Sequence, residues 1–381
     1  MNVLIAIDSF KGSLDTLAAG RAVSEAAVAV FVNAKATVCP LADGGEGTMD
    51  AVIASLGGKV IEKEVTGPLG EPVKARLGIV ESEKLAVVEM AEAAGLPLVP
   101  KDKRDPKSTT TRGVGELILY AINEYGCRRF LVGIGGSATN DGGVGMLSSL
   151  GFDFLDGEGD PVPDGAVGLG QIKRIKNDRV PREIFECEFK VACDVNNPLC
   201  GERGASAVYG PQKGASQSDV EMMDGCLSHF ADVTSEFVGR DMREYPGAGA
   251  AGGMGFAFLS YLDGHLQSGI ELVIEANRIE EKIKNADIVI TGEGRLDGQS
   301  CMGKAPVGIA KLAKKYGKIC VAFSGCLGDG AEQCNNHGID AYFPILPTVM
   351  PLDEAMNGEN AYKNLKNTAI QAFNLIKICT L

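Results

Sequence analysis

The sequence predicts an α/β protein in which both ends of the chain build one doubly wound parallel sheet, with a second α/β domain carrying a mixed sheet inserted between them. Three observations support this prediction. Near both termini, short apolar segments alternate with helix-like segments. Polar, glycine-rich loops follow the apolar segments. The middle of the chain instead has the composition of a β-hairpin followed by further strands.

Two strand–loop–helix units open the chain. The apolar run 3–7 leads into a polar loop, and residues 14–31 follow as an Ala-rich segment with good helix propensity. A second apolar run, 36–41, leads into a glycine-rich loop and a helix-like segment that ends at Leu56. This alternation of strand and helix is typical of a parallel sheet.

The same order returns at the other end of the chain. Its expected elements are strands at 287–291, 319–323 and 340–345, a helix at 305–316, and a closing helix marked by Tyr362, Leu365, Ala369, Ala372 and Ile376. Two strands before the insertion and three after it fit a flavodoxin-like order, in which the first strand lies beside the third. The loops 8–13 and 291–295, which follow these two strands, should then face one crevice.

The middle of the chain is expected to form the inserted domain. Residues 67–72 have turn composition between strand-like runs at 60–65 and 73–80. Further strands are expected at 85–90, 130–134 and 189–193, and a helix at 111–125. These segments assign 1–60 and 283–381 to a discontinuous flavodoxin-like domain and 61–282 to the inserted α/β domain.

The charge and the glycine content limit the range of partners. The formal net charge of −13 argues against a nucleic-acid or anionic-membrane partner, because both need a basic surface. It leaves small anionic substrates open, since these need only local positive charge or exposed backbone N–H groups. Fifty glycines in 381 residues, well above an average of about 7%, suggest many sharp turns or close approaches to a ligand.

The reactive residue types point to a cytoplasmic enzyme without a zinc site or a disulfide framework. There are eleven cysteines without a CxxC pair and only three histidines. No signal peptide is recognised at the apolar start, and the apolar stretch 248–262 is too short to span a bilayer. Carboxylates, hydroxyls, lysines and exposed backbone remain, and they suit phosphoryl transfer with Mg²⁺.

Lys11 and Ser13 lie just before the first expected helix. A helix N-terminus exposes unpaired N–H groups and carries partial positive charge, so it favours a phosphate. Lys11 would add a cation there and Ser13 a hydroxyl. The alternative is that Ser13 caps the helix and Lys11 is a solvated surface charge.

Residues 298–305 nearly match a phosphate-binding loop. Ala305 stands where that loop needs an Mg²⁺-binding hydroxyl, and the preceding strand ends too early. We therefore interpret the match as coincidental. Lys304, beside the N-terminus of the following helix, is still expected to contact a phosphate.

Residues 133–138 match a dinucleotide-binding pattern after an expected strand. The match is incomplete because 139–143 continue as a loop where a helix should already have started. The polar side chains of this segment are better suited to binding a polyhydroxy or phosphate ligand. They are Ser137, Thr139, Asn140 and Asp141.

Two further loops carry candidate residues. Asp194 directly follows an apolar strand, where it could accept a hydroxyl proton or hold Mg²⁺, or else form an Asx turn before Pro198. The segment 108–113 precedes a clear helix, so one threonine is expected to cap that helix while Arg112 binds a carboxylate. The segments 210–214 and 247–253 read as tight turns, the second of which could reflect close packing.

Together these loops resemble the bacterial type I glycerate kinase family. The similar stretches are 8–13, 41–48 (LADGGEGT), 65–68 (VTGP), 110–115, 133–143 (GIGGSATNDGG), 192–199 (ACDVNNPL), 210–214 (GPQKG), 247–253, 291–297 (TGEGRLD) and 303–306. They follow one another along essentially the whole chain, and this ordered set is far more specific than any single stretch. Residues 157–180 and the last forty residues match no motif of the family.

The resemblance implies transfer of the γ-phosphoryl group of ATP to a hydroxyl of D-glycerate with Mg²⁺, in a cleft between the two domains. It favours 2-phosphoglycerate, although the loops do not distinguish the 2-OH from the 3-OH. The expected partners are therefore ATP and glycerate, with a homo-oligomer left open. Two other readings remain: a nicotinamide-dependent dehydrogenase of a small hydroxy acid, based on 133–138, and a non-catalytic sensor of sugar acids.

The roles are assigned on chemical grounds. Asp194 is expected to accept the proton of the glycerate hydroxyl, with Lys11 as a second catalytic residue. The ATP phosphates are expected to contact Ser13, Lys213, Gly292, Gly294 and Lys304. The substrate is expected to contact Ser9, Arg112, Ser137 and Asn140. The expected Mg²⁺ ligands are Asp8, Glu293 and Asp297.

Overall fold

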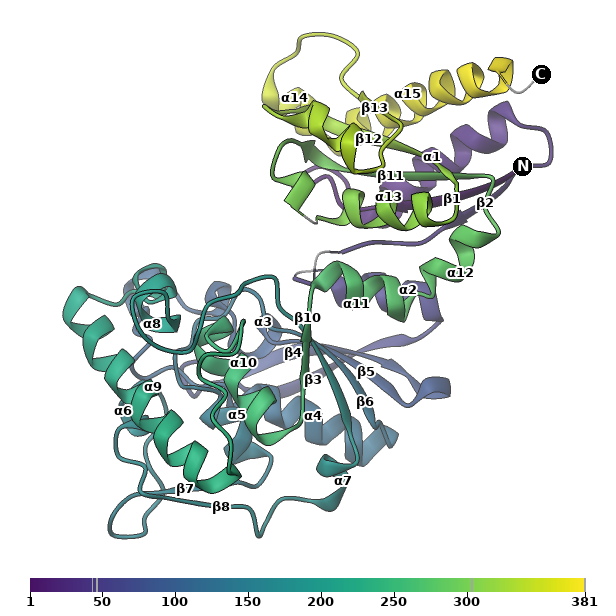
Figure 1. Cartoon of the computed structure of the whole chain (residues 1–381). Helices are drawn as coiled ribbons and strands as arrows, with labels where there is room; N and C mark the ends of the chain where they lie inside the picture. The colour runs from purple at the N-terminus through teal and green to yellow at the C-terminus, as the bar shows by residue number, and fades with distance from the viewer. Residues whose placement is uncertain (43, 46, 303, 380–381) are drawn as a thin grey trace. The chain divides into compact units, whose positions relative to one another are not determined.

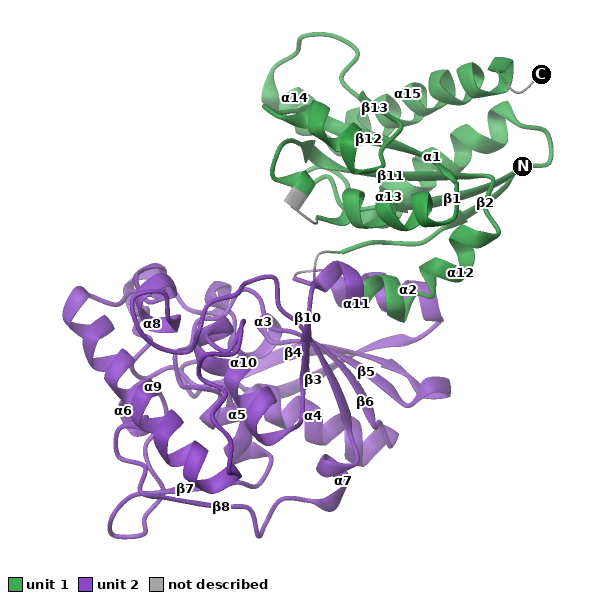
Figure 2. Ribbon diagram, in the orientation of Figure 1, with its two compact units in different colours: residues 1–43, 273–381 green, residues 44–272 purple. Residues whose placement is uncertain are grey.

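The protein is described by a computed structural model that covers residues 1–42, 44–45, 47–302 and 304–379. The chain divides into two compact units, residues 1–43 with 273–381 and residues 44–272 (Figure 2). We call them unit 1 and unit 2. The sequence places the boundaries at 60/61 and 282/283, whereas these units divide the chain at 43/44 and 272/273.

Unit 1 contains a five-stranded, wholly parallel sheet (Figure 1). Its strand order is β13-β12-β11-β1-β2. The strands are β1 (Asn2–Ile7), β2 (Lys35–Val38), β11 (Ile288–Leu296), β12 (Ile319–Leu327) and β13 (Ala341–Pro344). The first strand of this sheet lies beside the third, which confirms the predicted doubly wound order built from both chain ends.

Helices cover both faces of this sheet, with α1 and α15 on one face and α13 on the other (Figure 1). The helices of unit 1 are α1 (Thr16–Val30), α12 (Ile279–Lys284), α13 (Ala305–Lys315), α14 (Leu352–Met356) and α15 (Gly358–Cys379), with 3₁₀ turns at Ser300–Met302 and Ala331–His337. Small buried alanines on α1, including Ala19 and Ala22, let it pack closely against the strands. Phe31 and Phe373 close the same core edge to face, with ring centroids 5.8 Å apart.

Helix α1 begins at Thr16, and its cap is Asp15 rather than Ser13. The Asp15 carboxylate accepts the backbone N–H of Ala18 at 2.6 Å. The Ser13 hydroxyl instead donates to the carbonyl oxygen of Phe10 at 2.9 Å. The alternative that Ser13 caps this helix is therefore wrong.

Strand β11 is longer than the expected strand 287–291, because pairing continues into the segment expected to be a loop. Gly292 pairs with Phe323 and Arg295 with Cys326 of β12. A Cβ on Gly292 would lie 2.2 Å from the carbonyl oxygen of Phe323, so only glycine fits at this point of the sheet.

Unit 2 contains a six-stranded mixed sheet in the order β10-β9-β6-β5-β4-β3. Its strands are β3 (Lys59–Thr66), β4 (Pro72–Val80), β5 (Leu85–Glu89), β6 (Arg129–Gly133), β9 (Glu188–Ala192) and β10 (His265–Gln267). The pairs β3–β4 and β4–β5 are antiparallel, as the predicted hairpin requires, and the remaining pairs are parallel. A separate antiparallel pair is formed by β7 (Asp153–Leu155) and β8 (Arg174–Lys176).

The helices of unit 2 include a long one that the sequence analysis did not predict, α9 (Gln217–Val238), which begins with a capping box formed by Ser216 and Asp219. The others are α2 (Thr48–Leu56), α3 (Ala91–Ala94), α4 (Arg112–Tyr125), α5 (Val144–Ser149), α6 (Ala166–Leu169), α7 (Arg182–Phe185), α8 (Ala205–Tyr209), α10 (Ala250–Tyr261) and α11 (Gly269–Ala276, which crosses into unit 1). A buried aromatic cluster that includes Phe230 and Tyr261 lies between α9 and α10.

The glycine-rich segment 247–253 leads into α10 with left-handed backbone at Ala251, Gly252 and Gly253. A Cβ on Gly252 would lie 2.1 Å from the carbonyl oxygen of Thr139. This contact supports the interpretation that the segment serves close packing, here against the loop after β6.

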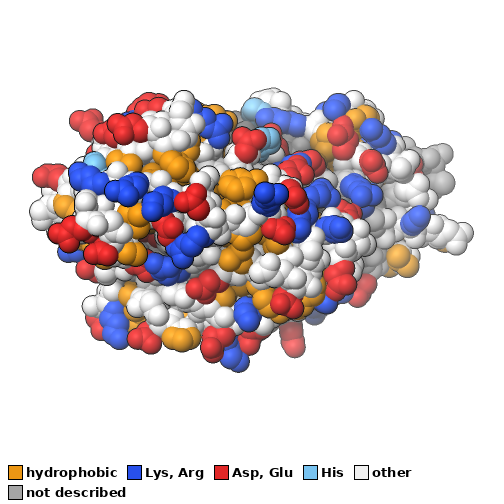
Figure 3. All heavy atoms as spheres, turned by 90° about the horizontal axis from the view of Figure 1, so that it is seen from below, with side chains coloured by type: hydrophobic (Ala, Val, Ile, Leu, Met, Phe, Trp, Pro, Cys, Tyr) orange, Lys and Arg blue, Asp and Glu red, His pale blue; other side chains and the backbone are white. Residues whose placement is uncertain are grey.

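No helix within the described part of the chain is long and apolar enough to cross a membrane. The eleven cysteines are all free. Acidic and basic side chains are interspersed on the face drawn in Figure 3, without a broad area of one sign.

Candidate active site

The carboxyl edge of the unit 1 sheet brings together the loops that follow β1 and the last part of β11. Ile7 pairs with Gly292, and the N–H of Asp8 donates to the Gly292 carbonyl oxygen at 3.0 Å. A Cβ on Gly294 would lie 3.3 Å from the backbone nitrogen of Lys11. The structure therefore places the segments 8–13 and 291–295 side by side, as the strand order predicts.

The residues after β1 differ in exposure. Asp8 is 9% exposed, and its carboxylate accepts the N–H of Ser9 at 2.6 Å. Phe10 is buried in the core of unit 1 and fixes the loop there. Lys11 follows it with an exposed side chain, and Ser13 is half-buried. The loop thus exposes the Lys11 ammonium, while the buried Phe10 side chain fixes the adjoining backbone.

Two acidic residues of this edge are Glu293, within β11, and Asp297, directly after it. Glu293 is 8% exposed, and its carboxylate accepts the Ser300 hydroxyl at 2.5 Å. Burial raises the pKa of Glu293, and the negative charges of Asp8 and Asp297 add to this effect. Asp297 accepts the N–H of Gln299 at 2.9 Å and pairs with Arg295 at 3.2 Å.

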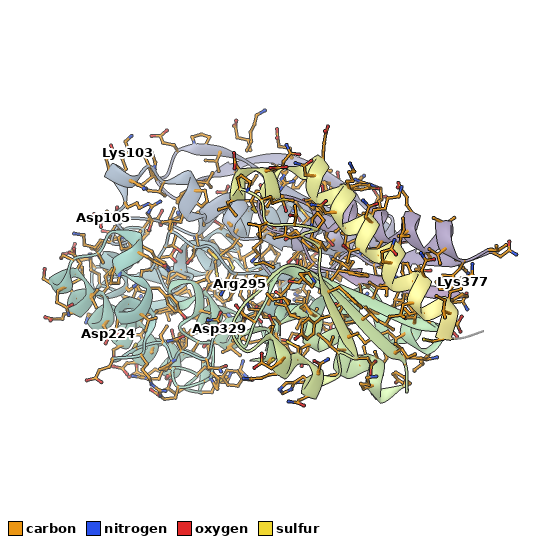
Figure 4. All side chains as sticks on the ribbon, turned by 90° about the horizontal axis from the view of Figure 1, so that it is seen from above. Lys103, Asp105, Asp224, Arg295, Asp329 and Lys377 are labelled. Atoms are coloured by element: carbon orange, nitrogen blue, oxygen red, sulfur yellow. The ribbon has the colours of Figure 1, made fainter. Side chains whose placement is uncertain are left out.

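Arg295 and the neighbouring turn frame this acidic group from the solvent side. Figure 4 labels Arg295, on β11, and Asp329, in the turn after β12. The Asp329 carbonyl oxygen accepts the N–H of Gly298 at 2.9 Å, which ties the two turns together. Lys304 lies beyond them at the N-cap position of α13, with an exposed side chain.

The oxygen donors of this edge suit Mg²⁺ in their chemistry. In the described ranges no three His, Cys, Asp or Glu side chains converge on a single metal position. Mg²⁺ usually takes only one or two carboxylates and completes its shell with water and phosphate oxygens. Asp8, Glu293 and Asp297 offer oxygen donors of the kind that Mg²⁺ takes in proteins.

Asp194 lies at the carboxyl edge of the unit 2 sheet, two residues beyond β9. Its side chain is exposed, and its Oδ1 accepts the N–H of Gly269, the first residue of α11, at 3.0 Å. This bond joins two chain segments that lie far apart in sequence. Asn197, in the same loop, is held instead by Tyr209, whose hydroxyl donates to Asn197 Oδ1 at 2.6 Å.

Lys213 lies in the interior of unit 2 rather than on a loop surface. It is 2% exposed, and its ammonium group donates to the Ser137 hydroxyl at 2.7 Å and to the Thr139 carbonyl oxygen at 2.6 Å. Burial lowers the pKa of Lys213 to about 7, against the opposing effect of the Asp141 carboxylate. Its nitrogen links the segment 210–214 to the loop after β6.

Asn140 is fully buried beside this lysine network. Its Nδ2 donates to the Ser206 hydroxyl at 2.9 Å. Its Oδ1 and the hydroxyl of Thr139 have no hydrogen-bond partner within the described chain. Burying two polar atoms without hydrogen bonds costs free energy. This loop therefore has two buried groups that could still form hydrogen bonds.

Asp141 joins the start of α4 to the loop after β6. The fully buried carboxylate accepts the N–H and the hydroxyl of Thr111 at 2.9 and 2.8 Å, and the N–H groups of Gly143 and Gly145 at 3.1 and 3.2 Å. Thr111 occupies the N-cap position of α4, but its hydroxyl makes no cap bond. A threonine is therefore the N-cap residue, as expected, but the Thr111 hydroxyl bonds to Asp141, and the Thr110 Oγ1 accepts the first helical N–H, that of Arg112, at 3.3 Å.

Arg112, the first residue of α4, is half-buried and pairs with Asp164, Nε to Oδ2, at 2.6 Å. This partner was not anticipated. Sequence reasoning also missed Glu89, a buried carboxylate at the end of β5. The sequence did contain a signal for Glu89: like Asp8 and Asp194, it is an acidic residue at the end of an apolar strand.

Some predicted motif residues lie outside the described part of the chain. These are Asp43 and Glu46 of the stretch 41–48, and Gly303 of the stretch 303–306. The other candidate residues separate into two groups. Unit 1 carries Asp8, Ser9, Lys11, Ser13, Gly292, Glu293, Gly294, Asp297 and Lys304, and unit 2 carries Arg112, Ser137, Asn140, Asp194 and Lys213.

Comparison with known proteins gives consistent matches over the whole chain. The family model described as the glycerate kinase family matches residues 3–377. A glycerate kinase of Bacillus subtilis (strain 168) is 45% identical over 378 residues, covering 99% of this chain and 98% of the relative. A glycerate 2-kinase of Escherichia coli (strain K12) is 46% identical over 365 residues, covering 96% and 95%.

A solved structure is also similar. It is the crystal structure of a protein provisionally named glycerate kinase 2, from Salmonella typhimurium LT2. The TM-score is 0.92 at 40% sequence identity, and the match covers 100% of this chain and 99% of that one.

Proposed function

The chain belongs to the glycerate kinase family, and from that premise we propose that it transfers the γ-phosphoryl group of ATP to the 2-hydroxyl of D-glycerate. The observation that carries the proposal is the carboxyl edge of the unit 1 sheet. There, exposed Lys11 and Lys304 accompany partly buried carboxylates at the position where doubly wound sheets bind nucleotides. The choice of the 2-hydroxyl is supported by the name of the Escherichia coli relative.

We assign ATP to this edge. Lys11 and Lys304 would neutralise phosphate oxygens, and the Ser13 hydroxyl would donate to one of them. The phosphates would contact the backbone at Gly292 and Gly294; at Gly294 the missing Cβ also keeps the Lys11 backbone open to them, whereas at Gly292 it serves the packing on Phe323. Asp8, Glu293 and Asp297 would hold Mg²⁺, which supplies charge neutralisation for the transferred phosphoryl group.

The proton of the reacting hydroxyl is assigned to Asp194. Its exposed carboxylate is oriented by the Gly269 N–H and is proposed to accept the proton of the substrate hydroxyl. Arg112, Ser137, Asn140 and, from unit 1, Ser9 are proposed to bind glycerate. The ammonium of Lys213 already donates to Ser137 and Thr139. Lys213 is therefore proposed to affect phosphate binding indirectly, by holding the loop after β6 in place.

The dehydrogenase alternative loses its structural basis at residues 133–138. A dinucleotide fingerprint needs a helix that starts within the glycine motif, so that its N-terminus meets the pyrophosphate. Here the next helix, α5, begins only at Val144. The sensor alternative differs in predicting glycerate binding without turnover of ATP.

One assay separates these functions. ADP release would be followed with ATP and D-glycerate, glycerol or glyoxylate, with and without Mg²⁺. The proposal predicts Mg²⁺-dependent ADP release with D-glycerate only. Glycerate binding without ADP release would support a sensor, and a change in reduced-nicotinamide absorbance would support a dehydrogenase.

A further inference from the structure

Glu89 is a buried carboxylate to which the mechanism above gives no role. It is the last residue of β5 and is 4% exposed. Its Oε1 accepts the N–H of Met49 at 2.8 Å, in the first turn of α2. First-turn N–H groups have no partner within their helix, so the Glu89 carboxylate acts here as a cap supplied by another strand.

The segment before α2 is packed against the carboxyl ends of neighbouring strands. A Cβ on Gly44 would lie 2.7 Å from the Cβ of Ala192 and 2.6 Å from the Cα of Gly269. A Cβ on Gly133 would lie 2.7 Å from the carbonyl oxygen of Gly44. Glu89, Gly133 and Ala192 lie in one row across the sheet, because each pairs with the next.

The contacts continue from this segment to the proposed base. The N–H of Thr48 donates to the Gly45 carbonyl oxygen at 3.2 Å, which ties the start of α2 to the clamped glycines. Gly44 packs on Gly269, and the N–H of Gly269 donates to Asp194 at 3.0 Å. Glu89 is thus linked to Asp194 by an unbroken set of contacts within unit 2.

We propose that Glu89 is a positioning residue for phosphoryl transfer: by anchoring the start of α2 it keeps Gly44 against Gly269, and so keeps Asp194 oriented to accept the substrate proton. The inference rests on the proposed function, in which Asp194 is the base. Glu89 itself touches neither substrate nor nucleotide in this scheme.

The charges around Glu89 come from three elements: Asp50 on α2, Glu92 on α3 and Arg76 on β4. Arg76 is already engaged, since its Nη2 lies 2.6 Å from Glu92 and its Nη1 lies 3.6 Å from Asp50. Burial, reinforced by the two acids, raises the pKa of Glu89 to about 7, although the Met49 N–H and Arg76 oppose this.

The ionised carboxylate accepts the Met49 N–H more strongly than the neutral acid does. Positioning should therefore improve as the pH rises through about 7. Lys213 titrates in the same range, so a pH profile of the wild-type protein alone cannot identify the group. Substitution of Glu89 separates the two.

The test compares Glu89→Gln with Glu89→Ala between about pH 6 and pH 8. Glutamine keeps an acceptor oxygen but no charge, so we expect kcat near the wild-type value at pH 6 and loss of the Glu89-dependent rise above it. Alanine removes the acceptor, so we expect kcat to fall on the order of tenfold at every pH, with the KM for ATP unchanged. A Glu89→Gln profile identical to that of the wild type would overturn the proposal.

A control in unit 1 is Asp340→Asn, at an exposed carboxylate that also pairs with Lys314. Asp340 also accepts a backbone N–H, that of Cys320 at 2.8 Å, but at the amino end of the unit 1 sheet. We expect its kcat and pH profile to match the wild type. An equal loss of kcat in Asp340→Asn and Glu89→Ala would mean that general destabilisation, not positioning, explains the effect.

Amide hydrogen exchange gives a readout that does not require activity. In Glu89→Ala we expect faster exchange at both Met49 and Gly269, because both N–H groups depend on the anchored segment. Exchange unchanged at Gly269 would overturn the positioning role. Absence of ADP release in the wild-type protein would instead contradict the proposed function, so the two failures are distinguishable.

Discussion

The two units hold their candidate residues at the same kind of place but in different ways. Both groups lie at or beyond the carboxyl ends of parallel strands. In unit 1 the lysines of this edge, Lys11 and Lys304, are exposed. In unit 2 the corresponding lysine, Lys213, is buried and donates to two oxygen atoms of the protein itself.

Under the proposed function, this difference would separate lysines that contact the nucleotide from a lysine that holds its own loop in place. An exposed ammonium keeps its charge and can neutralise a phosphate, whereas a buried one gives its hydrogen bonds to neighbouring segments. We therefore expect substitutions of the exposed Lys11 and Lys304 to change nucleotide binding with little effect on folding. Substitutions in the buried unit 2 network should change stability first. Asp194 is the exception in unit 2, since its side chain is exposed.

The largest effect is expected at that exception. Asp194→Ala removes the proposed base, so kcat should fall by more than about 10²-fold while the affinity for ATP stays unchanged. Steady-state ADP release and equilibrium nucleotide binding measure the two quantities. Turnover within a few-fold of the wild type would remove Asp194 from the chemistry and leave its bond to Gly269 as a purely structural feature.

Substitution of two glycines of β11 tests which of them is needed for packing and which for nucleotide binding. Gly292→Ala places a methyl group against the Phe323 carbonyl oxygen, so we expect the free energy of unfolding to drop by about 2–3 kcal/mol. Gly294→Ala meets the Lys11 backbone only at 3.3 Å, so we expect less than about 1 kcal/mol but a higher KM for ATP. Denaturant unfolding and kinetics of the two variants measure both effects. Equal stability losses would show that Gly294, too, is a packing glycine.

Lys213→Met tests the buried side of the comparison. The change leaves the Thr139 carbonyl oxygen without its donor, so we expect a loss of about 1–3 kcal/mol in the free energy of unfolding. The pKa of Lys213 is lowered from 10.5 to about 7 on folding, so the unfolded chain binds more protons between these values. Its contribution to stability should accordingly rise with pH in that window, and methionine should abolish this dependence. Unfolding experiments across the window would reveal it, and a dependence that persists in Lys213→Met would assign it to another group.

The smallest effects on stability and activity are expected from substitutions in the loop before α1. Asp15→Ala should lower the free energy of unfolding by about 1 kcal/mol, because it removes the helix cap. Ser13→Ala should leave stability nearly unchanged and raise the KM for ATP. The reverse pattern would contradict the assignment of Ser13 to the nucleotide.

The sequence predicted the helices and strands best where a local pattern of residues determines a single element. Apolar runs and glycine-rich turns located the strands of the unit 1 sheet and all but β10 of the unit 2 sheet, and the insertion explained why the first strand lies beside β11. Helix α9 was missed although its apolar residues recur at helical spacing, with Val220, Met223 and Leu227 buried on one side. The continuation of β11 to Leu296 was not predictable from its glycines, because the pairing with β12 outweighs their low strand propensity.

The candidate site was predictable only as a set of loops. Residues that follow strands, such as Asp8 and Asp194, could be found because topology places each at the carboxyl edge of its own sheet. Their partners could not be found, because Asp141 meets Thr111 and Arg112 meets Asp164 across long stretches of chain. The burial of Lys213 was hidden for the same reason, since an isolated lysine after Pro211 reads as exposed until its neighbours are known.

The most direct test of the proposed reaction is the identity of the product formed from D-glycerate, ATP and Mg²⁺. We predict ADP and phosphoglycerate in equal amounts, with a proton-coupled phosphorus NMR signal split into a doublet by the single hydrogen on carbon 2. A triplet, from the two hydrogens on carbon 3, would contradict the proposed 2-hydroxyl acceptor. Absence of any phosphorylated glycerate would contradict the kinase reaction itself.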